Sequence, residues 1–245
     1  MIPRFHCPFP LSPGAQVELP DAAAHHALKV LRMKAGDALI LFDGRGGEWQ
    51  AEILGAGKAA PTSRVVLRAF SERECESPLQ VTLAQGLPSG DKMDWVVEKC
   101  VELGVAAIQP IAAKRSVIRL SAERMERRVA HWNAIAAAAC EQCGRNRVPV
   151  VAPVLDLPQY LAMAKAQNAL RLLLAPAGDV SLRKLQQPTA GLIAMVGPEG
   201  GWEEGEVQAA RAAGFETLLL GPRVLRTETA GAAMLAALQA QWGDF

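Results

Sequence analysis

The chain has 245 residues, 50% of them apolar and 21% charged, and its 26 lysines and arginines against 25 aspartates and glutamates leave a formal net charge of +1. This balance excludes an acidic disordered chain and a uniformly basic nucleic-acid coat, so a polyanionic partner must be bound by a local patch. No apolar run approaches the ~18 residues of a membrane-spanning helix, and residues 1–13 lack the apolar core of a signal peptide. The five scattered cysteines favour a reducing compartment, and we expect a cytoplasmic protein.

The first seventy residues have the pattern of a small β-rich domain. A basic amphipathic stretch at 22–34 predicts one helix, with Asp21 as its N-cap. Short apolar runs between glycine-rich turns predict a β-barrel, with strands at 17–19, 38–42, 49–54 and 64–70. The polar run 71–78 predicts a linker, so we expect domains at 1–72 and 73–245.

From residue 79 onward, strand patterns alternate with helix patterns. Strands are predicted at 79–84, 105–111, 170–174, 192–196 and 215–220. Helices are predicted at 91–104, 121–141, 203–213 and 229–241. Several of the strand runs are continuously apolar, as expected where both faces of a sheet are covered. The alternation predicts an α/β domain with a mostly parallel sheet.

Two common site signatures are weak in this chain. Cys140 and Cys143 form a CxxC motif without a second pair, and the four histidines lack the spacing of metal ligands. No G-x-G-x-x-G motif follows any strand of the C-terminal part, which weakens a dinucleotide-binding interpretation. We therefore expect no metal site.

A glycine-rich loop follows the predicted strand 192–196. The segment 196–202 reads Val-Gly-Pro-Glu-Gly-Gly-Trp, and its three glycines allow the backbone to approach a ligand closely. A loop at the carboxyl end of a parallel strand is the usual place for a ligand. A tight strand-to-helix turn would explain the glycines but not Glu199 within the loop.

A second unusual connection follows the strand 215–220. Residues 220–231 place Arg223, Arg226 and Glu228 within six residues, just before a helix. Thr227 or Thr229 could simply cap that helix, with both arginines solvated. Yet Gly231 permits close approach of another segment, and Arg226 and Glu228 are predicted to face the same cleft as Glu199.

Two segments concentrate positive charge. The predicted helix 22–34 contributes Lys29, Arg32 and Lys34 without an acid, and 114–147 carries eight cations against three glutamates. On a nearly neutral chain such clusters suggest a phosphate-bearing partner, although a solvated surface is the alternative. The cations of the second segment are Lys114, Arg115, Arg119, Arg124, Arg127, Arg128, Arg145 and Arg147.

Taken in order, these motifs resemble those of the bacterial 16S ribosomal RNA (uracil-N3)-methyltransferase family of RsmE type, in the SPOUT (α/β-knot) superfamily. The two loops at 196–202 and 220–230 carry most of the resemblance, which covers essentially the whole chain. The family more often has serine at the Cys143 position, which further weakens a redox role for the CxxC motif. Other matching segments are 3–5, 25–32, Gly36-Asp37, 90–94, 98–104 and 141–145.

The resemblance implies a fold, a cofactor and a substrate. It implies an N-terminal PUA-like RNA-binding barrel and a C-terminal SPOUT domain whose deep trefoil knot binds S-adenosylmethionine. It also implies a homodimer that methylates N3 of a uridine near the 3′ end of 16S rRNA, in the decoding region of the 30S subunit.

Site residues follow by matching motif positions. Uracil N3 is a poor nucleophile until its proton leaves, so the reaction needs a base and a cation near the imide oxygens. Glu199 or Glu228 is the expected base, and Arg226 or the partner subunit's Arg145 the expected cation. The residues expected to hold the adenosyl group are Leu174, Gly197, Gly201, Leu220, Leu225 and Thr227. Those expected to contact RNA are Arg4, Lys29, Arg32, Lys34, Arg115 and Arg145.

Two other functions fit the same residues. One is a methyltransferase of the same fold that acts on tRNA or on another rRNA site. The other is a non-catalytic ribosome-assembly factor that binds rRNA through the barrel and the basic helix.

Overall fold

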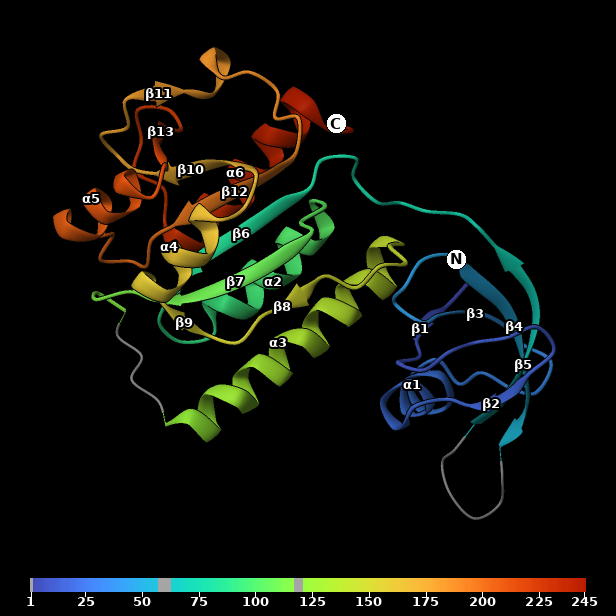
Figure 1. Cartoon of the computed structure of the whole chain (residues 1–245). Helices are drawn as coiled ribbons and strands as arrows, with labels where there is room; N and C mark the ends of the chain where they lie inside the picture. Colours follow the sequence, from blue (N-terminus) through green and yellow to red (C-terminus); the bar gives the residue numbers. More distant parts are fainter. Residues whose placement is uncertain (1, 57–62, 117–120) are drawn as a thin grey trace. The chain divides into compact units, whose positions relative to one another are not determined.

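The computed structural model describes residues 2–56, 63–116 and 121–245 and divides into two compact units (Figure 1). The first comprises residues 1–76 and 137–148, and the second residues 77–136 and 149–245. The division thus falls a few residues after the boundary predicted at 72. The sequence pattern did not indicate that 137–148, the end of a long helix and the loop after it, belongs to the first unit.

The first unit contains a five-stranded sheet within its described residues. The strand order is β1-β3-β4-β5-β2, with β1 parallel to β3 and all other neighbours antiparallel. On β5, Val65, Val66 and Leu67 are buried, while Arg64 and Arg68 on either side of them are exposed. The strands are β1 (Arg4–His6), β2 (Gln16–Glu18), β3 (Ala38–Phe42), β4 (Glu48–Ala56) and β5 (Ser63–Ser71).

The predicted helix at 22–34 is shorter than expected and begins earlier. Helix α1 (Asp21–His25) continues as a π-helical turn, η1 (His26–Val30), and Pro20 rather than Asp21 occupies the N-cap position. The helix stops because Arg32 adopts a left-handed conformation with φ of 55°. Lys34 then donates its backbone N–H to Asp37 Oδ2 over 2.7 Å. Lys29 is therefore helical, while Lys34 lies in a turn.

Two arginines expected to bind RNA are buried in ion pairs. Arg4 pairs with Glu48 and donates to Asn146 Oδ1 over 2.6 Å, and its side chain is only 6% exposed. Arg145 pairs with Glu76 at 2.6 Å and is equally buried. Both charges are satisfied inside the first unit, which argues against Arg4 and Arg145 as phosphate contacts. The same pairing argues against a catalytic role for the partner subunit's Arg145.

The second unit is built on a parallel sheet, confirming the predicted α/β class. Its strand order is β11-β13-β10-β12-β6-β7-β8, with β9 also pairing with β7, and every neighbouring pair is parallel. The strands are β6 (Val81–Gly86), β7 (Ala107–Ala112), β8 (Val150–Val151), β9 (Leu155–Asp156), β10 (Ala169–Leu174), β11 (Val180–Ser181), β12 (Gly191–Val196) and β13 (Glu216–Leu219).

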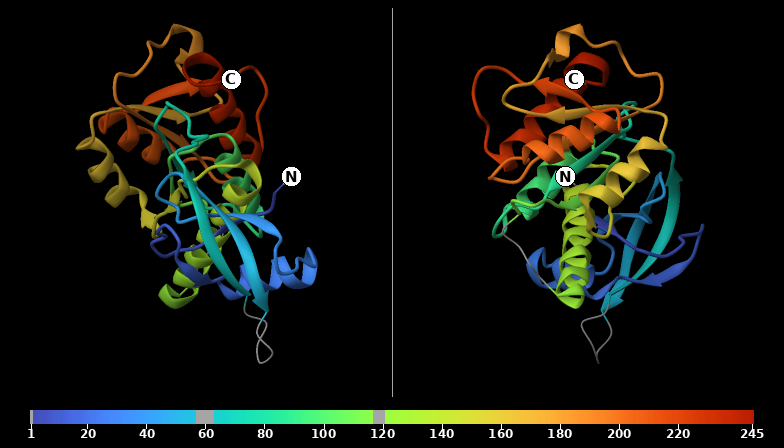
Figure 2. Two further views of the ribbon diagram at one scale, coloured as in Figure 1. Left: turned by 90° about the vertical axis from the view of Figure 1, so that its right-hand side faces the viewer. Right: turned by 60° about the vertical axis from the view of Figure 1, so that its left-hand side comes forward.

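Helices cover both faces of this sheet. Tyr160 of α4 and Ala210 of α5 share a core with Ile193 and Met195 of β12. On the opposite face, a Cβ at Gly231 of α6 would lie 3.3 Å from Leu83 of β6. In the left view of Figure 2, α4 (yellow) and α6 (red) accordingly lie on opposite sides of the sheet. The helices are α2 (Lys92–Glu102), α3 (Ala122–Cys143), α4 (Leu157–Lys165), a 3₁₀ turn η2 (Leu182–Lys184), α5 (Glu204–Ala212) and α6 (Thr227–Trp242).

Among the described residues, none of these helices is long and apolar enough to cross a membrane.

The buried Arg4–Glu48 pair gives a direct test of the first unit. We expect Arg4→Met to lower the free energy of unfolding by about 3–5 kcal/mol, because Glu48 is left buried without its counter-charge. Arg68→Met is the matched control, since Arg68 pairs with Glu52 at 2.9 Å but is 55% exposed, and its loss should cost about 0–1 kcal/mol. Equal losses in urea unfolding of the two variants would contradict the structural role of Arg4.

Candidate functional site

A cavity of about 610 Å³ lies at the carboxyl ends of β10, β12 and β13. It brings together every residue that the sequence assigned to catalysis or to the adenosyl group, apart from the alternative cation Arg145. Strand β10 lies between β12 and β13 in the sheet, so the loops that follow those two strands meet over its last residue, Leu174. The predicted residues lining the cavity are Leu174, Gly197, Glu199, Gly201, Leu220, Leu225, Arg226, Thr227 and Glu228.

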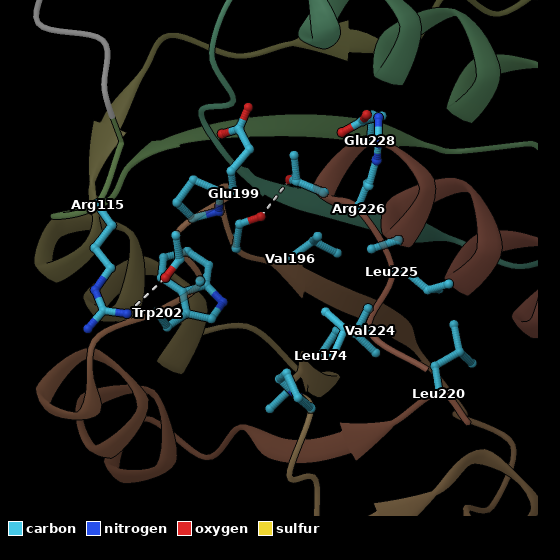
Figure 3. A pocket seen from close by; sticks show the side chains of 18 of the residues that line it. Arg115, Leu174, Val196, Glu199, Trp202, Leu220, Val224, Leu225, Arg226 and Glu228 are labelled. Carbon is cyan, nitrogen blue, oxygen red and sulfur yellow. Dashed lines mark hydrogen bonds between the residues drawn. The ribbon is translucent and has the colours of Figure 1, made fainter. Parts of the chain in front are cut away.

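The cavity has a charged end and an apolar end. In Figure 3, Glu199, Arg226 and Glu228 lie on one side, while Leu174, Leu220 and Val224 lie on the other. Val224 is 80% exposed, an unusual position for an apolar side chain beside a cavity. Such an arrangement suits a ligand with one apolar part and one reactive, charged part.

A buried hydrogen-bond chain joins the two loops. Thr227 donates its hydroxyl to the Gly197 carbonyl over 2.6 Å and accepts a hydrogen bond of 2.9 Å from Gln85 Nε2. Gln85 is fully buried on β6, so the chain runs from the sheet through α6 to the glycine loop. Thr227 thus fixes both loops as well as lining the cavity.

Two glycines are required by the backbone here. Gly201 has φ of 66°, and its N–H closes a turn onto the Pro198 carbonyl over 2.8 Å. Gly86, at the end of β6, lets Pro198 of the glycine loop pack closely against the strand, because a Cβ at residue 86 would lie 2.6 Å from Pro198 Cδ. The glycine loop is therefore packed directly against the strand end.

Glu199 is held by several donors at once. Its Oε1 accepts hydrogen bonds from the Ser89 N–H (3.0 Å), the Ser89 hydroxyl (2.6 Å) and Lys92 Nζ (2.7 Å). Partial burial alone would raise the pKa of Glu199, but the hydrogen bonds from Lys92 and Ser89 outweigh it and lower the pKa to about 2. Glu199 is consequently a very weak proton acceptor.

Glu228 has the opposite surroundings. It lies in the first turn of α6, and its Oε2 is buried without a hydrogen-bond partner among the described residues. Lys92 Nζ lies 4.0 Å from this oxygen, which is too far for a hydrogen bond. An unpartnered buried carboxylate oxygen that lines a cavity is costly unless a ligand donor meets it. Glu228 is therefore the carboxylate with a free acceptor position.

Lys92 is the residue that sequence reasoning missed. It lies within the 90–94 segment and lines the cavity, yet no role was assigned to it. Its hydrogen bond to Glu199 raises the pKa of Lys92, so it stays charged at neutral pH. The two residues are 107 positions apart, and no local pattern could show that they meet.

The residues predicted to contact RNA lie in different parts of the structure. Lys29, Arg32 and Lys34 are exposed on the first unit, where their predicted role stays open. Arg115 lines the cavity and donates to the Gly200 carbonyl over 2.8 Å, the contact drawn in Figure 3. Its role toward phosphate stays a prediction.

The basic segment 114–147 is less positive than its composition suggested. Lys114 pairs with Glu203, Arg127 with Glu123 and Arg147 with Glu74, in addition to the buried pair of Arg145. Arg119 lies outside the described residues. Acids from distant parts of the sequence therefore neutralise several of these cations.

The CxxC motif is structural. Cys140 is buried and donates to the Arg147 carbonyl over 3.7 Å, and burial raises the pKa of its thiol to about 12. The described residues contain no group of three or more His, Cys, Asp or Glu side chains that could hold a metal ion.

The contrast between the two glutamates can be measured by titration. Because folding favours the ionised form of Glu199, its interactions stabilise the protein above its usual pKa of 4.5, and this contribution is lost as the pH falls through about 2. In ¹³C NMR spectra of the unliganded chain, the Glu199 carboxyl should stay ionised to about pH 3, and Lys92→Met should raise its pKa toward 4.5. Lys99→Met, on the same helix, is the control and should leave it unchanged. A wild-type midpoint near 4.5 would contradict the assignment.

Comparisons with known proteins show the family of this chain. Residues 75–239 match the model of an RNA methyltransferase domain, and residues 19–66 match that of an RNA methyltransferase PUA domain. The chain is 34% identical to ribosomal RNA small subunit methyltransferase E of Bacillus subtilis (strain 168), over 89% of this chain and 87% of the relative. It is 35% identical to the protein of the same name from Synechocystis sp., over 92% of this chain and 73% of the relative.

Two solved structures are similar over the full length of both chains. One is ribosomal RNA small subunit methyltransferase E from Neisseria gonorrhoeae bound to S-adenosyl methionine, with 40% identity and a TM-score of 0.92. The other is a protein from Legionella pneumophila in complex with the cofactor SAM, with 37% identity and a TM-score of 0.95. The chain therefore belongs to the ribosomal RNA small subunit methyltransferase E family of RNA methyltransferases, with a PUA-like N-terminal domain.

Proposed function

We propose that the protein transfers a methyl group from S-adenosylmethionine to N3 of a uridine near the 3′ end of 16S rRNA, in the decoding region of the 30S subunit. The observation that carries the proposal is the cavity itself. It joins an apolar floor, two glycine-dependent loops and a carboxylate oxygen that has no hydrogen-bond partner in the described part of the chain.

The residues around the cavity fit the methyl donor. Leu174, Leu220 and Leu225 offer apolar contacts for an adenosyl group, and the loop backbones offer polar ones. The indole N–H of Trp202, which also lines the cavity, is buried without a hydrogen-bond partner in the described residues. When bound, S-adenosylmethionine supplies an electrophilic methyl carbon whose bond to sulfur breaks with both electrons left on sulfur.

Glu228 is the better base of the two glutamates. Three hydrogen bonds to its Oε1 and a pKa of about 2 make Glu199 a poor proton acceptor. Glu228 lines the cavity and has a carboxylate oxygen without a hydrogen bond. In this proposal it takes the N3 proton, which leaves the N3 electron pair able to bond to the methyl carbon. N3 lies on the Watson–Crick edge, so the target base must be unpaired or flipped out.

Arg226 supplies positive charge beside the base. It precedes α6 at its N-cap position, is exposed, and lies next to Glu228 in Figure 3. Its guanidinium stabilises the negative charge that develops on the imide oxygens as the N3 proton leaves.

The remaining expectations belong to the same proposal. Lys29, Arg32, Lys34 and Arg115 hold rRNA phosphates, and Arg115 also contacts the glycine loop through the Gly200 carbonyl. The protein acts in the cytoplasm as a homodimer, and the second unit carries the trefoil knot that the family resemblance implies.

Methylation assays test the enzymatic role of Glu228. Wild-type protein should transfer a labelled methyl group to 30S subunits or 16S rRNA, with 3-methyluridine as the product identified by mass spectrometry. Glu228→Gln should lower the turnover number about 10²-fold or more while donor affinity, measured by calorimetry, stays within about twofold.

Glu204→Gln is the matched control, since Glu204 is an exposed glutamate in the first turn of α5, and it should retain full turnover. Unchanged turnover of Glu228→Gln would remove Glu228 from the mechanism. Label found in tRNA rather than 16S rRNA would overturn the substrate assignment.

If the first unit binds RNA through phosphates, the affinity should depend on the salt concentration. Replacing Lys29 and Arg32 together by alanine should weaken binding to 16S rRNA and flatten the dependence of log Kd on log salt by about one to two. The double alanine variant of Arg183 and Lys184, two exposed cations on η2, removes the same charge elsewhere and should retain the wild-type slope. Identical slopes for both variants, measured by filter binding, would refute a phosphate-binding role for Lys29 and Arg32.

A further inference from the structure

Lys92 and Glu228 place a hydrogen-bond donor and a hydrogen-bond acceptor side by side in the cavity. Lys92 Nζ and Glu228 Oε2 are 4.0 Å apart, and both residues line the same cavity. They form an ion pair at this separation but do not hydrogen-bond to each other, so neither group uses up the hydrogen-bonding capacity of the other. The pair offers one donor next to one acceptor.

The ammonium group of Lys92 is held in place by Glu199 and not by Glu228. It donates to Glu199 over 2.7 Å, and Glu199 is in turn held by the N–H and the hydroxyl of Ser89. An ammonium has three N–H donors, and in the described residues only Glu199 accepts one from Lys92. Glu199 is thus a positioning residue that fixes the place of the cation.

The imide edge of uracil is complementary to this pair. Uracil has an N–H donor at N3 and a carbonyl acceptor at C4 directly beside it. Glu228 can accept from N3–H while Lys92 donates to the neighbouring carbonyl oxygen. Cytosine reverses both characters, because its N3 is an acceptor and its 4-amino group is a donor. A cytosine in the same position would place a lone pair against the carboxylate and an N–H against the ammonium.

We propose that Lys92 and Glu228 together select uracil over cytosine, with Glu199 and Ser89 holding Lys92 in place. This inference rests on the proposed function and adds to it the residues that read the base. The same ammonium stabilises the negative charge on the carbonyl oxygen as the N3 proton passes to Glu228. A site whose donor and acceptor both pair with one base rejects a base that leaves the donor and acceptor unpaired, or that places like groups against them.

Arg226 is the competing candidate for the donor. It is exposed and its guanidinium makes no hydrogen bond within the described residues, whereas the Lys92 ammonium is fixed by Glu199. A fixed donor discriminates between bases by its position, while a solvated guanidinium can adapt to either. Arg226→Met should therefore weaken binding of both bases alike.

Binding to two RNAs that differ by one base tests the proposal without turnover. The probes are 30S subunits reconstituted with 16S rRNA that carries uridine or cytidine at the position methylated by the wild-type protein, as found by mass mapping. Unliganded wild-type protein should bind the uridine form about tenfold or more tightly. Lys92→Met and Glu228→Gln should each reduce this preference to about twofold or less.

Three further variants complete the comparison. Lys92→Arg keeps a charged donor and should retain most of the preference, which guards against a folding defect in Lys92→Met. Glu199→Gln weakens the anchor and should lower the preference partly. Lys99→Met is the matched control, because Lys99 lies on the same helix and pairs with Glu98 and Glu102, and it should keep the full preference.

The outcomes separate this inference from the proposed function. A wild type that makes 3-methyluridine but binds both RNAs equally would overturn the inference and leave the function intact. The same holds if Lys92→Met keeps the preference, or if Arg226→Met alone abolishes it. A wild type that methylates no RNA would overturn both.

Discussion

The hydrogen bond that Thr227 donates to the Gly197 carbonyl is the contact on which the site depends. The two loops leave strands β12 and β13, which flank β10 and are not themselves neighbours, so the sheet alone brings the loops near each other without fixing their separation. Thr227 closes this gap at 2.6 Å, and buried Gln85 orients it from β6. The first residue of α6 is thereby tied to the glycine loop, and the sheet sets the position of the helix turn that carries Glu228.

Lys92 gives the two glutamates of the cavity different surroundings. Lys92 contacts Glu199 at 2.7 Å but stays 4.0 Å from Glu228, so two residues of the same type acquire different properties. The hydrogen-bonded glutamate is locked as an anion, and the other keeps an acceptor oxygen for a ligand. When the surroundings of two carboxyl groups move their pKa values apart, the two groups can play different chemical roles at the same pH. In the proposed mechanism this difference assigns the base to α6 and the anchor to the glycine loop.

The sequence predicted the elements whose signals are local. Apolar strand runs followed by glycine loops, at 192–202 and 215–231, lie where expected, and the residues assigned to the adenosyl group line one cavity. What failed depended on contacts distant in sequence. Arg4 and Arg145 read as free cations because their acidic partners lie 44 and 69 positions away.

Two other differences have local and topological causes. The helix predicted to reach residue 34 ends at Val30, since a left-handed turn at Arg32 competes with a basic amphipathic pattern that could have continued. Lys92 escaped notice because a lysine at a helix start has no sequence signature, and only the strand order places it beside Glu199. Residues 137–148 join the first unit through ion pairs that the composition of the segment does not reveal.

A crystal structure of this chain with S-adenosylmethionine bound would show whether the cavity holds the methyl donor beside Glu228. We expect the adenosyl group over Leu174, Leu220 and Leu225, with the methyl carbon directed toward the side of the cavity that holds Lys92 and Glu228. This expectation would be contradicted if the donor bound elsewhere on the chain, or if its methyl group pointed away from Glu228 with that carboxylate paired to another side chain.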